Sequence, residues 1–170
     1  MASLVEELIT TLNQENEIYE GLIPINEKKT KVIINNDLEA LQEITKTEQE
    51  MVQEISALET KRQEVIINIG TVINRNPGTL TLKNLIQLLE KQPKEQKQLS
   101  IIHDKLQKTV HRLTEINHQN QSLIEQSLEM IEFNMNFIQS TRMSPGNNYN
   151  KDASGIEMQI EQTRRFDTKQ

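Results

Sequence analysis

The chain has 170 residues, enough for one domain of ordinary size, and a hydrophobic content of 35%, which is low for a globule with a thick core. Aromatic residues make up only 3%, and there are 5 Gly and 4 Pro, a composition typical of long helices or coiled coils. The absence of Cys excludes disulfides, thiolate metal sites and cysteine nucleophiles, and a net charge of -6 with interspersed signs argues against nucleic acid as the main partner.

The first residues, Met1 to Glu7, lack the basic stretch and the apolar run of a secretory signal. No stretch of about eighteen apolar residues offers a membrane span. We therefore expect a cytoplasmic protein without a membrane-spanning segment.

A first helix is predicted from about Ser3, because Ser3 and Glu6 have the spacing of a capping box. Pro24 predicts a kink or an early end, since proline removes an amide donor, and the apolar pattern then resumes weakly through Ile33. Residues 35–37 read as a turn, with Asn36 or Asp37 as the next helix cap. The apolar residues of this helix are Val5, Leu8, Leu12, Tyr19 and Leu22.

A second, coiled-coil-like helix is predicted from Leu38 to Ile73, where two rows repeat every seven residues, and residues 74–78 with Pro77 and Gly78 end it. The rows are Leu41, Glu48, Ile55, Arg62, Ile69, and Ile44, Met51, Leu58, Val65, Val72. Glu48 and Arg62 interrupt an apolar row about 21 Å apart, too far to pair with each other. We expect each to meet a polar or charged group on a neighbouring helix and to fix register, in preference to a functional role.

A short third helix is predicted after Thr79 or Thr81, and Pro93 suits the first turn of a fourth helix that runs to about Arg142, on the order of 75 Å. The third helix carries Leu82, Leu85, Ile86, Leu88 and Leu89. The fourth must pack against other helices, most simply the first and second running antiparallel to it. The fold expected is all-α: an elongated antiparallel bundle of three long helices with a short connecting helix over residues 1–142, and a flexible polar tail over residues 143–170.

Enzymatic chemistry has little support in the sequence. His103, His111 and His118 lie roughly 10–12 Å apart along one helix and cannot share a metal there. Glu115 and His118 match a Glu-x-x-His pattern, but di-iron bundles need two such motifs, and this pair points away from the apolar stripe. No nucleotide-binding glycine loop or catalytic triad is recognisable. We expect no enzyme activity, no metal and no cofactor.

The stretch from Leu123 to Ile138 carries two apolar stripes, centred about 130° apart on a helical wheel. The first, expected to continue Leu106, Val110 and Leu113 as an intramolecular seam, comprises Ile124, Leu128, Ile131, Met135 and Ile138. The second comprises Leu123, Met130, Phe133 and Phe137. Either the helix packs between two neighbours, or the second stripe stays exposed to receive a partner's amphipathic helix. The sequence favours neither.

Several features occur together in this chain: the order of the helices, Glu48 in a seam, Leu58-Glu59-x-x-Arg62, and a long last helix ending in residues 120–138. In these features the chain resembles the FlgN family of flagellar export chaperones. The resemblance extends to about Gly155, with Tyr149 to Gly155 similar to a Tyr and Gly pairing after the last helix of the family. Here Asn150 follows Tyr149, where the family usually has Gly directly.

This resemblance implies a chaperone that binds helical C-terminal regions of hook-filament junction (hook-associated) proteins, prevents their premature assembly and delivers them to the flagellar type III export gate. Leu123, Met130, Phe133 and Phe137 are then the candidate client-binding residues, and Tyr149 with Gly155 the candidate gate-docking residues. A monomer or small homo-oligomer is expected. The competing hypothesis is a structural coiled-coil protein that self-associates through the same stripes and has no transient client.

Overall fold

The structure is a computed structural model of the chain, and it describes residues 2–142. All elements of this part are helical: α1 (Ala2–Ile34), α2 (Leu38–Val72), the 3-10 turn η1 (Pro77–Thr79), α3 (Leu82–Leu88) and α4 (Pro93–Arg142). The all-α prediction is confirmed. The chain divides into two units, residues 1–129 and residues 130–170, each considered by itself below. We call residues 130–142 of α4 the distal segment.

Local sequence signals account for the starts of α2 and α3. The Asp37 carboxylate accepts a hydrogen bond from the Ala40 amide at 3.1 Å and caps α2. Thr81 caps α3 in the same way, through the Asn84 amide at 3.1 Å. α1 runs through Pro24, so the early end predicted there is wrong. Leu22 and Asn26 are buried on either side of this exposed proline, and their packing holds the helix together.

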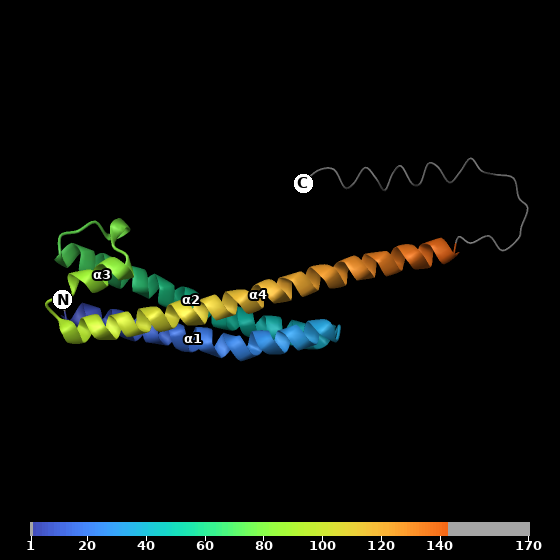
Figure 1. The fold of residues 1–170 in the computed structure, drawn as a ribbon, viewed down its shortest axis with the longest axis horizontal. Helices are drawn as coiled ribbons and strands as arrows, with labels where there is room; N and C mark the ends of the chain where they lie inside the picture. Colours follow the sequence, from blue (N-terminus) through green and yellow to red (C-terminus); the bar gives the residue numbers. More distant parts are fainter. Residues whose placement is uncertain (1, 143–170) are drawn as a thin grey trace, which may run out of the picture. The chain divides into compact units, whose positions relative to one another are not determined.

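Ion pairs show the direction of the helices in residues 1–129. α1 and α2 are antiparallel, because Glu15 pairs with Arg62 and Lys29, further along α1, pairs with the earlier residue Glu48 (Figure 1). α4 runs parallel to α1, because pairs between them advance together along both helices: Glu20 with Lys105, and Glu27 with Arg112. The prediction that α4 is antiparallel to both α1 and α2 is therefore wrong. Since α1 and α2 already oppose each other, a helix antiparallel to α2 must run with α1.

The main core of this unit joins all of its helices. Most of its side chains are at most 3% exposed, and burying one such aliphatic side chain stabilises the fold by about 1.5–3 kcal/mol. Its buried members are Val5, Leu8 and Leu12 of α1, Val65, Ile66 and Ile69 of α2, Leu85 of α3 with Leu89 after it, and Leu99, Ile102 and Leu106 of α4. A smaller cluster joins Leu22, Ile55 and Leu113.

The chain turns back tightly after α2 because of one glycine. A Cβ at the buried Gly70 would lie 3.0 Å from Pro77 Cγ and 3.1 Å from the Arg75 carbonyl oxygen. Asn74 takes a left-handed conformation at φ 55° in the same turn, as asparagine tolerates. Glycine at 70 thus lets the loop and η1 lie directly against α2.

Within residues 2–142, none of the helices has a stretch both long enough and apolar enough to traverse a bilayer.

Candidate functional site

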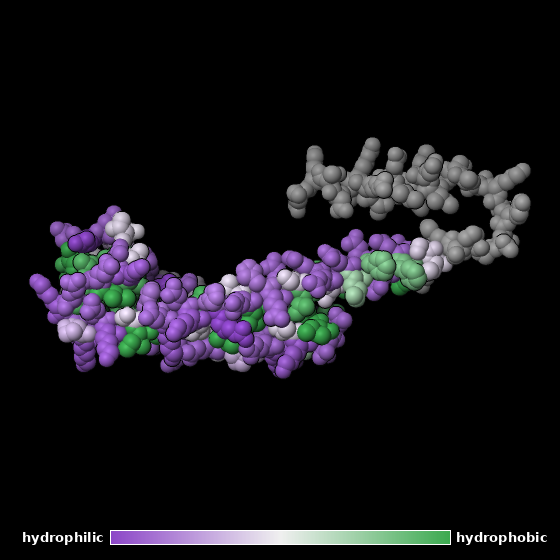
Figure 2. Space-filling view, viewed as in Figure 1, coloured by the Kyte–Doolittle hydropathy of each residue, from purple (hydrophilic) through white to green (hydrophobic). Residues whose placement is uncertain are grey.

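The distal segment carries large apolar side chains that are open to solvent. Met130 is 66% exposed, Phe133 68% and Phe137 60%, whereas Leu123, the fourth predicted client-binding residue, is half-buried in the other unit. Figure 2 shows hydrophobic surface gathered on this part of α4. Exposed apolar side chains in such density are typical of a protein interaction surface.

The predicted intramolecular seam is wrong for most of its members. Leu128, Ile131, Met135 and Ile138 are 50–60% exposed, and only Ile124 is half-buried. The buried row of α4 follows another line with alternating spacings of three and four: Leu99, Ile102, Leu106, Thr109, Leu113, Ile116 and Asn120. Because Thr109 and Asn120 are polar, a search for apolar residues alone misses this row and follows the exposed Val110 instead.

Continued at the same spacing, the buried row passes through Leu123, Ser127, Met130, Asn134 and Phe137. We call the whole line, from Leu99 to Phe137, the seam row of α4. It includes three of the four predicted client-binding residues, and Phe133 lies beside it on the wheel. The exposed apolar surface of the distal segment is thus centred on the line that packs inward earlier in the same helix.

Glu48 and Arg62 each lie opposite a charged side chain of α1. Lys29 Nζ lies 2.7 Å from Glu48 Oε2, with both side chains mostly buried. Arg62 Nη1 donates to Glu15 Oε2 at 2.9 Å. Both pairs join α1 to α2 at fixed positions, the geometry expected of contacts that set register.

Glu15 is the buried carboxylate of this unit, with a side-chain exposure of 0%. Burial raises its pKa above the ordinary value, and the Arg62 guanidinium opposes that rise. The other oxygen, Oε1, has no hydrogen-bond partner among the described residues. The sequence did carry a signal for Glu15, which lies three residues after Leu12 and seven before Leu22 on the apolar stripe of α1.

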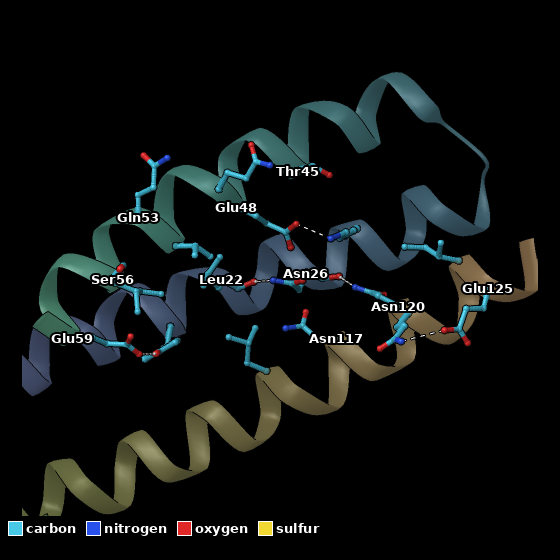
Figure 3. A pocket seen from close by; sticks show the side chains of 18 residues that line it. Leu22, Asn26, Thr45, Glu48, Gln53, Ser56, Glu59, Asn117, Asn120 and Glu125 are labelled. Carbon is cyan, nitrogen blue, oxygen red and sulfur yellow. Dashed lines mark hydrogen bonds and ion pairs between the residues drawn. The ribbon is translucent and has the colours of Figure 1, made fainter. Parts of the chain in front are cut away.

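An open groove of about 1320 Å³ lies among α1, α2 and α4 in residues 1–129. Figure 3 shows Glu48, Ser56 and Glu59 along the α2 side and Asn117, Asn120 and Glu125 along the α4 side. Leu22 and Asn26 of α1 lie between them. Amide, hydroxyl and carboxylate groups line its sides, but most of its surface is apolar, with Leu22, Ile55 and Leu113 in contact at its floor.

Two buried asparagines form a polar contact at one end of the groove (Figure 3). Asn120 Nδ2 donates to the Asn26 carbonyl oxygen at 3.0 Å, and the Thr30 hydroxyl donates to Asn120 Oδ1. Asn26 Nδ2 in turn donates to the Leu22 carbonyl oxygen at 3.0 Å. The seam row of α4 thus contains a buried amide whose hydrogen bonds are made by α1, a contact that sequence spacing alone did not reveal.

Tyr19 lies at the opposite end of this groove. Its hydroxyl donates to Glu59 Oε1 at 3.4 Å, and burial together with the nearby Glu59 charge raises the pKa of the phenol. Tyr19 therefore remains a neutral hydrogen-bond donor at physiological pH.

The three histidines lie apart from one another on α4. His103 Nδ1 is 3.2 Å from Asp104, and the exposed His111 is 3.4 Å from Glu115. His118 is also exposed. Among the described residues no group of three or more His, Asp or Glu side chains is placed to hold a metal ion.

Comparison with known proteins assigns the chain to a family. Neither the curated proteins nor the solved structures gave a match. A family model described as FlgN protein matches residues 1–155 of the 170. The chain belongs to the FlgN family. The general role of a FlgN protein is that of a flagellar export chaperone.

The FlgN match includes every residue of the distal segment and extends beyond the described part of the chain. Tyr149 and Gly155, the candidate gate-docking residues, lie within the match but outside the described residues. The family match therefore covers both the client-binding and the gate-docking candidates. Of these two sets, the structure describes only the client-binding residues.

Proposed function

We propose that this FlgN chaperone binds helical C-terminal regions of hook-associated proteins in the cytoplasm, prevents their premature assembly and delivers them to the flagellar export gate. The client-binding residues are Leu123, Met130, Phe133 and Phe137, and the gate-docking residues are Tyr149 and Gly155. A bundle of three long helices over residues 1–142 carries the first set, and a flexible tail over residues 143–170 carries the second. The protein acts by binding and not by catalysis.

The exposure of the apolar distal segment is the observation that carries this proposal. Phe133 and Phe137 are two of the three Phe residues of the chain, and both are at least 60% exposed. Leaving two phenylalanines in water forgoes the stabilisation of burial, about 1.5–3 kcal/mol each. A client helix that covers them recovers it, which is how amphipathic helices dock on apolar surfaces.

Phe133→Ala combined with Phe137→Ala tests the client site. We expect client affinity to fall by about tenfold or more, since buried aromatic anchors dominate such interfaces. Helicity and thermal stability stay unchanged, because both side chains are exposed in the free chain. Isothermal titration of a purified hook-associated protein into the variant measures the affinity, and circular dichroism measures the fold.

Ile34→Ala combined with Val72→Ala is the matched control, because it truncates two similarly exposed apolar side chains that belong to residues 1–129, at 62% and 57% exposure. This control keeps wild-type affinity. Equal losses in both double variants would mean that general surface hydrophobicity, and not the distal segment, binds the client.

Tyr149→Ala tests the division between binding and delivery. We expect client affinity to remain at the wild-type level while secretion of the client falls, because the aromatic anchor for the gate is lost. A pull-down and a secretion assay measure the two quantities in the same strain. A Tyr149 variant that loses client affinity contradicts separate client and gate sites.

A self-associating structural coiled coil makes the opposite prediction about the same exposed side chains. Such a protein oligomerises alone, whereas the proposed chaperone is a monomer or small oligomer that forms a defined complex when client is added. Sedimentation of the purified chain with and without a hook-associated protein distinguishes the two functions.

A further inference from the structure

We propose that the client supplies two helices to the distal segment, one on each side of Asn134, and so continues along α4 the packing that α1 and α2 provide earlier. This inference rests on the proposed function and specifies the shape and chemistry of the client surface.

Continuity of the seam row is the first support. In residues 1–129 this row contacts two helices at once, because Leu113 clusters with Leu22 of α1 and Ile55 of α2. Leu99, Ile102 and Leu106 likewise share one core with side chains of both helices. The row keeps its alternating spacing of three and four residues through Met130, Asn134 and Phe137, whose side chains are exposed in the distal segment. The same line of the same helix therefore offers a surface built for two neighbours.

The width of the apolar surface is the second support. On a helical wheel, apolar side chains extend about 100° to either side of Asn134. One packed helix covers a stripe of roughly 100°, so a single client helix would leave half of this surface in water. One flank consists of Met130, Phe133 and Phe137, and the other of Ile131, Met135 and Ile138.

Asn134 at the centre is the third support. Asn120 lies fourteen residues earlier, almost four whole turns, and so points in nearly the same direction. Its amide is buried and bonded to the Asn26 carbonyl oxygen and the Thr30 hydroxyl of α1. Two client helices closing over Asn134 must likewise present a hydroxyl or a carbonyl to its amide, because an unpaired buried amide costs about 1–3 kcal/mol. Asn134 therefore fixes the register of the client, as a seam asparagine does in coiled coils.

Charge distinguishes such a client from a second copy of this chain. Residues 119–141 contain no Lys, Arg or His, and Glu129 and Glu132 lie on the face opposite Asn134. Client helices packed on the two sides of Asn134 bring their outer edges near these glutamates, and a second distal segment has no Lys, Arg or His at residues 130–141 to pair with them. The partner that fits is a pair of amphipathic helices with Lys or Arg along their outer edges.

The test compares four variants by titration with a full-length, purified hook-associated protein. Phe133→Ala with Phe137→Ala truncates one flank, and Ile131→Ala with Ile138→Ala truncates the other. Asn134→Ala removes the central amide, and its matched control is Asn136→Ala, the same substitution at an exposed asparagine about 160° away. We expect both flank variants to lose about tenfold or more in affinity. Asn134→Ala loses about tenfold, and Asn136→Ala retains the wild-type affinity.

A loss confined to the phenylalanine flank means that one client helix binds, which overturns this inference and leaves the proposed function standing. Affinity unchanged in both flank variants overturns the inference and the proposed function together. Equal effects of the Asn134 and Asn136 substitutions overturn the central contact. A concentration-dependent dimer of the free chain that Ile131→Ala with Ile138→Ala abolishes identifies a second copy as the occupant, and also overturns the inference.

Discussion

Single buried charges and amides hold specific positions between helices in this protein. Glu15 is fully buried against Arg62, and Asn120 is 3% exposed against Asn26 and Thr30. Each needs its partner, because a buried charge or amide without one costs more than an apolar side chain in the same place. These residues therefore select one alignment of the helices among those that apolar contacts alone would permit.

Arg62→Met removes the partner of Glu15. We expect the free energy of unfolding at pH 7 to fall by about 1–3 kcal/mol, since the carboxylate stays buried and loses its charged hydrogen bond. Arg75→Met, the same substitution at an exposed arginine, changes stability by less than about 0.5 kcal/mol. Urea denaturation of both variants measures the difference, and equal stabilities would contradict the importance of the pair.

The same variant has a predictable pH dependence. Burial raises the folded-state pKa of Glu15 above its ordinary value of 4.5, at which the unfolded chain titrates, and Arg62 lowers it. Between the ordinary and the raised pKa the folded state holds the extra proton, so stability falls as pH rises through that window. Removing Arg62 raises the folded pKa further and widens the window. The deficit of Arg62→Met therefore shrinks as the pH is lowered from 7 toward 4.5, and a deficit that grows on acidification would contradict this cause.

At the scale of helices, two exposed prolines differ in their effect on stability. Pro24 lies inside α1 and lacks the amide that would bond to the carbonyl of residue 20, whereas Pro93 begins α4, where no such bond is needed. Pro24→Ala should raise the free energy of unfolding by about 1–3 kcal/mol. Pro93→Ala should change it by only a few tenths of a kcal/mol. Thermal denaturation of the pair measures both effects, and an unchanged melting temperature for Pro24→Ala would contradict a cost of the missing amide in α1.

The helices and their ends were largely predictable, and the pairing between them was not. Asp37, Thr81 and Pro93 act within one turn of the chain, so their effects follow from nearby residues. The direction of α4 relative to α1 depends on the whole order of connections, which local spacing does not contain. The seam row was missed because Thr109 and Asn120 break its apolar pattern, although both are buried by contacts across helices. The groove depends on how three helices lie together and has no local signature.

For the molecule as a whole, the FlgN assignment and the exposed distal segment support a chaperone that handles helical clients. Residues 1–129 bury an apolar core among their own helices and leave scattered apolar side chains exposed, whereas α4 concentrates large exposed apolar side chains from Leu128 to Ile138. A chaperone gains from this arrangement, because its core keeps the fold while the proposed client surface stays open. A client that covers this surface must reduce the access of water to the distal segment.

Hydrogen exchange of the chain, free and saturated with a purified hook-associated protein, tests the central claim most directly. The amides of residues 128–142 should exchange more slowly in the complex by about tenfold or more, because client binding suppresses local opening of this helix. Protection in the core around Leu8 and Ile69 should change little. Unchanged protection over residues 128–142 in a saturated complex would contradict the account, because the client would then bind elsewhere.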